Sequence, residues 1–282
     1  MTLQVSPTVA SLTRARACCI GRTAGRVLAG RERWGRVLAV VSGTAYLVTD
    51  EDELFWLARP DLPAHTRAIL APFDERAVGA GMPVSAGRGG LRIADRLLID
   101  GTRAAEWAPP PVAPDSVAPA GAIEARVRAL GRWRGTSLPI AAIERACRAG
   151  DLAAVAVASR ALIGLGAGLT PAGDDFVGGV LFALHEVRIA RPGALRWAEA
   201  PVQELLDYAR SQTNRLSYTM LADLAQGEAV EPLHDLVAAV LSGQDGDRVL
   251  VPARRLLGLG STSGAEMLAG ALTGLLLIAA GH

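Results

Sequence analysis

Lysine is absent from the 282-residue sequence, and all 29 basic side chains are arginine. This absence excludes chemistry that depends on a lysine amine, such as a Schiff base or the phosphate-binding lysine of a Walker-type loop. Aromatic residues are also scarce, at 4% of the chain. The formal net charge is only +1, so no long-range field favours a nucleic acid or an anionic membrane as a partner.

Cysteine is rare as well. The three cysteines, Cys18, Cys19 and Cys147, lack metal-ligand spacing and a catalytic signature, which favours buried free thiols. No pair of histidines has the spacing of zinc ligands. The N-terminus lacks the apolar core of a signal peptide, and the apolar run Met267–Ala280 is too short to span a bilayer. We therefore expect a cytoplasmic protein that does not enter a membrane.

Residues 1–110 carry the pattern of a β-rich domain. Val37–Val41 and Thr44–Thr49 flank the dipeptide Ser42-Gly43, which predicts two strands joined by a tight two-residue turn. Shorter strands are predicted at 53–57, 91–94 and 97–99. Short strands with frequent turns favour a small barrel or sandwich over a parallel sheet.

A proline-rich stretch follows, with five prolines from Pro109 to Pro119 and almost no large apolar residue. We interpret residues 111–120 as a linker between domains. Helical periodicity dominates residues 121–282, so the predicted fold is α+β, with an all-α second domain. The predicted helices cover 122–130, 139–149, 151–163, 171–190, 201–226 and 231–241, with a last helix from about Gly264.

A glycine-rich segment introduces the most informative helix. Thr170 is predicted as its N-cap and Pro171 as its first residue. The upstream glycines Gly164, Gly166 and Gly168 permit positive φ angles and, together with the N–H groups of the helix start, outline an anion-binding loop. Gly173, in the first turn, is a further candidate for substrate binding. However, Asp174 and Asp175 follow at once, and two carboxylates repel a bound phosphate unless a cation or a cationic substrate group intervenes.

The sequence Gly164-Leu-Gly-Ala-Gly-Leu-Thr-Pro-Ala-Gly-Asp-Asp-Phe176 resembles the signature of a bacterial family that includes the AllH subunit of oxamate carbamoyltransferase. Two further segments are similar to that family: Thr213-Asn-Arg-Leu-Ser217 and Gly258-Leu-Gly-Ser-Thr-Ser-Gly264. The family usually continues the latter with an aromatic residue and an aspartate, whereas Ala265 and Glu266 stand here. The resemblance implies carbamoyl transfer between phosphate and oxamate in allantoin and nitrogen catabolism, together with other subunits.

The chain also contains an internal similarity. The segments Gly173–Leu181 and Gly264–Leu272 align without a gap, which places Asp175 over Glu266 and Gly179 over Gly270. Each carboxylate lies above a stripe of small residues suited to close helix packing. We therefore expect the two helix starts to face one pocket, although similar packing of two glycine-rich helices would leave the same pattern.

Structural and functional interpretations remain open for the other candidates. The two aspartates could merely compensate the helix dipole, but the apolar helix around them indicates burial, and a buried carboxylate requires a partner or a function. Thr213 and Ser217 could bond to the preceding helical turn or contact a substrate, while Asn214 and Arg215 could reach the rim of a pocket.

The leading hypothesis is a carbamoyltransferase subunit that binds a small anionic substrate. Asp174 and Asp175 are its candidate catalytic residues, and an oxygen-ligated Mg²⁺ is a cofactor consistent with them and with Glu266. The alternatives are a non-catalytic metabolite-binding or assembly subunit and a Mg²⁺-dependent hydrolase. Beyond the residues already named, the candidate substrate-binding set includes Ser261, Thr262, Ser263 and Gly264.

Overall fold

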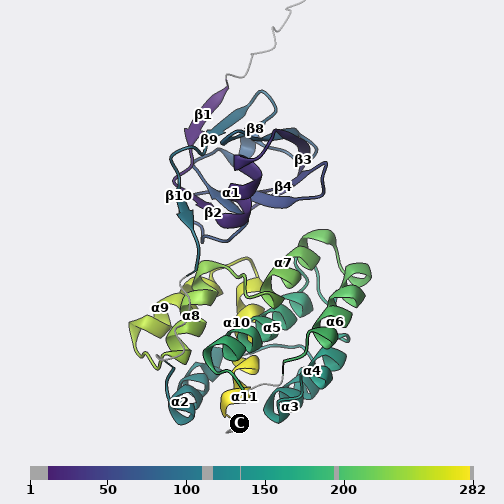
Figure 1. Ribbon diagram of the computed structural model, residues 1–282, viewed down its shortest axis with the longest axis vertical. Coiled ribbons are helices and arrows are strands. Elements are labelled where there is room, and N and C mark those ends of the chain that lie inside the picture. The colour runs from purple at the N-terminus through teal and green to yellow at the C-terminus, as the bar shows by residue number, and fades with distance from the viewer. Residues whose placement is uncertain (1–11, 110–116, 134, 194–196, 280–282) are drawn as a thin grey trace, which may run out of the picture. The chain divides into compact units, whose positions relative to one another are not determined.

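The computed structural model describes residues 12–109, 117–133, 135–193 and 197–279. The chain divides into two compact units, Met1–Ala108 and Pro109–His282 (Figure 1). Most of the predicted linker, residues 111–116, lies outside the described residues. Its last part is docked on the helical unit, because the Ala118 N–H donates a hydrogen bond to Leu241 O at 2.8 Å.

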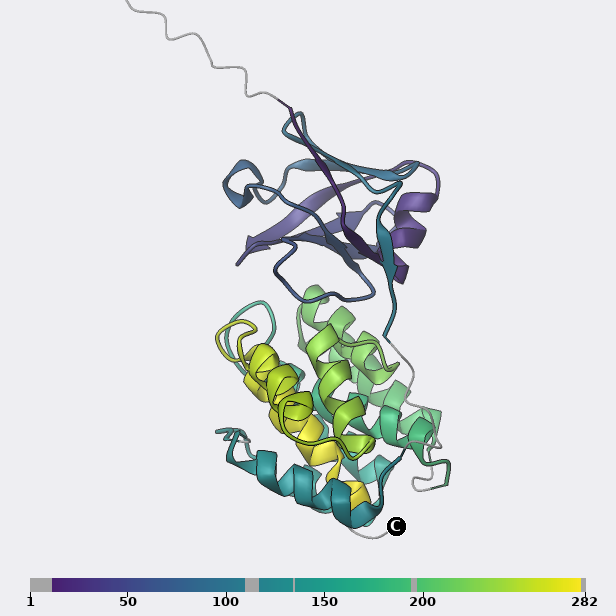
Figure 2. The ribbon, with the colours of Figure 1, turned by 90° about the vertical axis from the view of Figure 1, so that its left-hand side faces the viewer.

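The first unit is built on one ten-stranded sheet within residues 12–109, in the order β1-β9-β8-β7-β3-β4-β5-β6-β2-β10 (Figures 1 and 2). Only Ala17 and Cys18 separate β1 from β2, so the chain passes directly from one edge of the sheet to strands near the other, and the sheet curls. In chain order from β1 to β10, the strands are Thr13–Arg16, Cys19–Gly21, Arg33–Val41, Thr44–Thr49, Leu54–Ala58, Ala68–Leu70, Pro83–Gly87, Gly90–Ile93, Leu97–Asp100 and Ala105–Trp107.

Alternating apolar residues fill the interior of this sheet, and helix α1 (Arg22–Ala29) packs onto the same core. The predicted hairpin is confirmed: β3 and β4 pair antiparallel around Ser42 and Gly43, whose φ angles are 50° and 81°. Positive φ at both turn residues is the requirement of a type I′ turn. The short strands predicted near 53–57, 91–94 and 97–99 are also present as β5, β8 and β9.

The second unit is helical. Its elements are α2 (Ala120–Leu130), η3 (Gly131–Trp133), α3 (Ala141–Ala149), α4 (Leu152–Ser159), α5 (Ala172–Ala190), α6 (Glu199–Gln212), α7 (Arg215–Ala225), α8 (Glu231–Leu241), α9 (Asp247–Leu257), α10 (Ser263–Gly274) and α11 (Leu276–Ala279). Figure 1 shows α5 and α10 side by side at the centre of this unit. Among the described residues, no helix combines the length and the hydropathy needed to cross a bilayer. A β-sheet unit followed by a helical unit confirms the α+β prediction.

Two local predictions in this unit were wrong, and one helix was not predicted. The helix predicted over 201–226 is broken between α6 and α7, where Asn214 accepts a hydrogen bond from Ser217 N at 3.1 Å and starts a new helix. Helix α9 was not predicted, because Pro252 and three arginines obscure its apolar face. The helix that Asp151 caps ends at Ser159, earlier than expected, and a turn leads into the glycine-rich loop.

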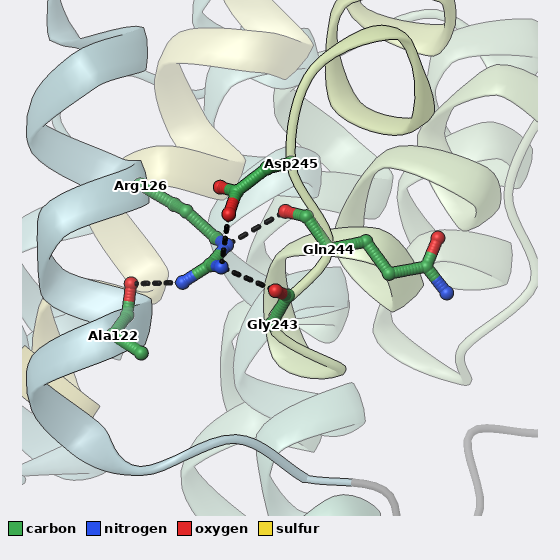
Figure 3. A network of polar contacts seen from close by, with 5 residues as sticks. All are labelled: Ala122, Arg126, Gly243, Gln244 and Asp245. Atoms are coloured by element: carbon green, nitrogen blue, oxygen red, sulfur yellow. Dashed lines mark hydrogen bonds and ion pairs between the residues drawn. The ribbon is translucent and has the colours of Figure 1, made fainter.

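Arg126 on α2 fastens the loop between α8 and α9 (Figure 3). Its Nε donates to Gln244 O at 2.6 Å, and its Nη1 donates to Ala122 O at 2.7 Å. Its Nη2 donates to Gly243 O and also to Asp245 Oδ2, the latter at 2.9 Å. Only 14% of this side chain is exposed. One guanidinium thereby donates hydrogen bonds to three backbone carbonyls, in place of the water that these carbonyls bind in the unfolded chain.

We predict that Arg126→Ala lowers the free energy of unfolding by roughly 1.5–3 kcal/mol, because it removes hydrogen bonds from a charged donor and leaves carbonyl oxygens unsatisfied. Arg128→Ala on the same helix is the control. Arg128 is 76% exposed and pairs with Glu124, so its loss should cost less than about 1 kcal/mol. Urea titrations of both variants measure the difference, and equal effects would contradict the role assigned to Arg126.

Candidate functional site

The helical unit contains two structurally related segments, each consisting of a helix, a glycine loop and a buried helix. The first is α4, its loop and α5, and the second is α9, its loop and α10. The sequence Leu162-Ile-Gly-Leu-Gly166 corresponds to Leu256-Leu-Gly-Leu-Gly260, just ahead of the similarity already noted. The helices that precede these segments also correspond: α3, before the first segment, contacts α10 of the second, and α8, before the second segment, contacts α5 of the first.

Equivalent hydrogen bonds hold the two loops. In the first loop, Leu165 N donates to Leu162 O at 2.9 Å and Gly173 N donates to Leu165 O at 2.8 Å. The second loop repeats the pattern, with Leu259 N donating to Leu256 O and Gly264 N to Leu259 O, both at 3.0 Å. The sequence similarity therefore corresponds to a repeated backbone structure.

Glycines permit the two central helices to approach each other closely. A Cβ on Gly179 would lie 2.3 Å from Met267 O, and a Cβ on Gly270 would lie 2.0 Å from Phe176 O. Phe176 and Met267 are themselves equivalent in the alignment, so the two contacts are reciprocal. The Cβ position of Gly179 also faces Ala271 N, and that of Gly270 also faces Val180 N. The helices therefore run parallel about a local pseudo-twofold axis, with both N-termini at the same end of the pair.

The two helix starts are joined by side chains. Thr170 Oγ1 and Ser263 Oγ lie 2.8 Å apart and share a hydrogen bond. Thr170 was predicted as the N-cap of α5, but Pro171 occupies that position and no side chain caps the helix. The Thr170 hydroxyl instead reaches across to α10, since the close packing brings the second helix start within its range.

Asp174 is a buried acceptor for three donors. Gly164 N donates to its Oδ1 at 2.7 Å, Ser217 Oγ donates to its Oδ2 at 2.6 Å, and Thr213 Oγ1 donates to the same oxygen. These donors come from the glycine loop, the end of α6 and the first turn of α7. Thr213 and Ser217 therefore bind Asp174 and do not bond back to their own helix.

Asp175 is in a different environment, although it is adjacent in sequence. It is only 3% exposed, and its Oδ2 has no hydrogen-bond partner. Burial raises the pKa of this carboxyl to about 7; hydrogen bonds from Ser263 and Thr170 act against the rise, and the negative charges of Asp174 and Glu266 add to it. A carboxyl with this pKa gains and loses its proton near neutral pH.

Glu266 occupies the equivalent place on α10. It is 8% exposed, and its Oε2 also lacks a hydrogen-bond partner. Burial raises the pKa of this carboxyl, while a hydrogen bond from Thr136 lowers it. Thr136 lies in the segment before α3 and was missed by the sequence analysis, because nothing in its local pattern links it to a residue so distant in sequence.

The remaining predicted site residues surround this cluster in different ways. Asn214 caps α7 and donates to Leu169 O at 2.8 Å, which fastens the glycine loop. Arg215 is the half-buried first residue of α7. Ser261 and Thr262 lie exposed in the second loop. The loop glycines with positive φ are Gly164, Gly166, Gly168 and Gly260.

The anion-binding arrangement outlined by the sequence is largely occupied by the protein itself. The N–H groups of Gly164, Gly173 and Gly264 already donate to protein acceptors. A three-carboxylate Mg²⁺ site is also absent, since the described residues contain no group of three or more His, Cys, Asp or Glu side chains that could hold a metal. What remains open is the pair of unpartnered oxygens on Asp175 and Glu266.

We expect Gly270→Ala to lower the free energy of unfolding by roughly 1–3 kcal/mol or more, because the new Cβ collides with a backbone oxygen that cannot move aside. Gly121→Ala on α2 is the control, since no heavy atom lies within 4 Å of its Cβ position. That change should raise the free energy of unfolding by up to about 1 kcal/mol. Thermal unfolding of both variants tests the prediction, and a neutral Gly270→Ala would disprove the close contact.

A second prediction concerns pH. The folded pKa of Asp175 lies above its ordinary value of 3.8. The native carboxyl therefore holds its proton where the unfolded one has lost it, and this stability is present below about pH 4 and lost as the pH rises through about 7. Asp175→Asn should raise the free energy of unfolding at pH 8 by roughly 1–4 kcal/mol and flatten its decline between these pH values.

Asp174→Asn provides the contrast, because it weakens three hydrogen bonds and should lower the free energy of unfolding at pH 8 by roughly 1.5–3 kcal/mol. Chemical denaturation across the pH range measures both variants. If Asp175→Asn were the destabilising one, the hydrogen bonds that Asp175 accepts from Ser263 and Thr170 would outweigh the cost of burying its charge.

The comparisons with known proteins bear on the same segment. No curated protein and no solved structure matches the chain significantly. One family model matches residues 162–275, and its description reads oxamate carbamoyltransferase subunit AllH. This range runs from the first glycine loop to the end of α10 and contains both halves of the pseudo-twofold pair. The resemblance drawn from the sequence is thus confirmed: over residues 162–275 this chain matches the AllH family.

Proposed function

We propose that this chain is a subunit of a carbamoyltransferase that transfers a carbamoyl group between phosphate and oxamate. The observation that carries the proposal is the coincidence of the family match with the residues that build the site. The matched range, 162–275, includes Asp174, Asp175 and Glu266, both glycine loops and the Thr170–Ser263 bridge. This coincidence supports our assignment of the reaction to the segment with unsatisfied buried carboxylates.

The chemistry of the transfer suits a carboxyl with a neutral pKa. The amide nitrogen of oxamate attacks the carbonyl carbon of carbamoyl phosphate, the bond from that carbon to the phosphate oxygen breaks, and phosphate leaves with the electron pair. The nitrogen must lose one proton in the process. Asp175, with its pKa raised to about 7 by burial, is suited to accept that proton at neutral pH.

The cluster of buried carboxylates is also a reason to expect that the chain acts together with other protein subunits. The phosphate group carries negative charge, and the carboxylates of Asp174, Asp175 and Glu266 disfavour it nearby. The chain uses the N–H groups of Gly173 and Gly264 internally. We therefore propose that another subunit holds the phosphate end, which agrees with the description of the AllH family protein as a subunit.

Two other functions remain as alternatives. A non-catalytic subunit would bind oxamate and leave the reaction to its partners. A Mg²⁺-dependent hydrolase would require further oxygen ligands, since Asp174 is fully engaged by three donors and the described chain assembles no set of three carboxylate or imidazole ligands.

The test is to co-express the chain with the products of its neighbouring genes and to measure phosphate release from carbamoyl phosphate in the presence of oxamate. We predict that Asp175→Asn, in an assembled complex, lowers kcat by roughly 10²–10⁴-fold, because the side chain keeps its shape and loses its capacity to accept a proton. Asp247→Asn is the control: Asp247 is an exposed carboxylate in the first turn of α9, and its loss should leave the rate unchanged.

If Asp175→Asn weakens oxamate binding and the complex still reaches the normal rate at saturating substrate, Asp175 serves in binding alone and the chain is the non-catalytic subunit. Normal binding and normal turnover would refute both assignments, and they would leave the carboxylate as a charge at a helix start.

A further inference from the structure

We propose that Asp175 and Glu266 together form a binding site for a neutral primary-amide or urea-type group, which donates its N–H groups to the two unpartnered carboxylate oxygens. The site would decide which end of a substrate enters the helical unit. This inference deepens the proposed function and rests on it for the identity of the natural substrate. The preference for an amide over a carboxylate follows from the residues of this chain.

The first argument is the state of the two oxygens. Asp175 Oδ2 and Glu266 Oε2 are both inaccessible to solvent and without a hydrogen-bond partner, on side chains that are 3% and 8% exposed. A buried acceptor without a donor is costly, and a buried carboxylate more so. The pair is therefore poised to gain free energy from a ligand that brings donors.

The second argument is position. The pseudo-twofold axis relates Asp175 to Glu266, and the reciprocal glycine contacts bring their helices together. Ser263 on α10 hydrogen-bonds Asp175 on α5, and the negative charge of Glu266 raises the pKa of Asp175. The two carboxyls thus interact across the helix pair.

The third argument excludes other ligands. An anionic group at this position would meet two carboxylates, and the N–H groups of Gly173 and Gly264 could not compensate its charge because they are already used. The negatively charged end of a substrate such as oxamate would therefore point away from the pair. A divalent ion would find fewer than three carboxylate, imidazole or thiolate ligands within the described chain. A neutral group with two N–H donors satisfies both oxygens without adding charge.

The exposed loops above the pair offer a route for such a ligand. Residues 165–169 and 260–262 are solvent-exposed, whereas the carboxylates lie beneath them in the first turns of α5 and α10. Gly168 has a φ of 102° and no heavy atom within 4 Å of its Cβ position, so open space adjoins this part of the loop. In the proposed site, a small planar group would enter between the two loops.

The pH dependence of binding has a defined sign. An ionised carboxylate accepts N–H hydrogen bonds more strongly than a protonated carboxyl does, and burial raises the pKa of Asp175 to about 7. Amide binding should therefore strengthen as the pH rises through about 7 and level off above it. Groups that face Asp175 from the packed elements are Asp174 on its own helix and Glu266 on α10, and both are acidic.

The experiment measures binding of matched pairs of small molecules to the full chain at pH 8 by calorimetry. Oxamate and oxalate differ only in an amide against a carboxylate, and malonamate and malonate repeat the comparison in compounds without the oxamate skeleton. We expect each amide to bind at least about tenfold more tightly than its dicarboxylate partner, because unpaired buried charges reject the anion. Asp175→Asn and Glu266→Gln, which replace an acceptor oxygen by an N–H donor, should each reduce or reverse this ratio.

Glu186→Gln is the matched control. Glu186 is a half-buried carboxylate near the far end of α5, where it contacts His185, and its loss should leave the ratio unchanged. A folded Asp175→Asn variant that keeps the ratio of the unmodified chain would overturn the proposal. Equal affinity for amides and dicarboxylates, or no binding of any amide, would overturn it as well.

The outcomes separate this inference from the proposed function. If the amide preference holds for both pairs while the assembled complex fails to transfer a carbamoyl group, the amide site is supported and the carbamoyltransferase assignment is refuted. If the complex transfers the carbamoyl group and the isolated chain distinguishes neither pair, the amide site is refuted and the assignment of the subunit stands.

Discussion

The close contact between α5 and α10 is the constraint on which the site depends. Each helix places a glycine against a backbone oxygen of the other, Gly179 on Met267 and Gly270 on Phe176, so no larger residue fits at either point. This contact sets the two helix starts side by side and allows Thr170 to reach Ser263. It also buries Asp175 and Glu266 together, and their raised pKa values are a consequence of that burial.

Two adjacent aspartates show how one helical turn separates structural and chemical roles. Asp174 accepts hydrogen bonds from Gly164, Thr213 and Ser217, and these tie the first loop to the break between α6 and α7. Asp175 points to the other helix and keeps an unpartnered oxygen. The rigid anchoring through Asp174 holds Asp175 in an environment that would otherwise relax toward water, because a buried unpaired carboxyl is unfavourable.

The sequence was sufficient to predict the α+β class, the hairpin at Ser42-Gly43 and the internal repeat, since each depends on local periodicity or turn chemistry. The alignment of the repeat also paired Asp175 with Glu266, and the structure places both in the first turns of their helices. It did not predict the different environments of Asp174 and Asp175, because these arise from donors about 40 residues away in sequence. Thr136 was missed for the same reason, and α9 was missed because Pro252 masks its pattern.

The central claim is that the two halves of the helical unit share one site, with Asp175 and Glu266 at its base. The most direct measurement is a crystal structure of the full chain with oxamate bound at pH 8. The account predicts the amide nitrogen of oxamate within hydrogen-bond distance, about 2.7–3.2 Å, of both carboxylates, beneath the loops at 165–169 and 260–262. Oxamate bound with its carboxylate toward Asp175, or bound at a place that contacts only one of the two helices, would contradict it.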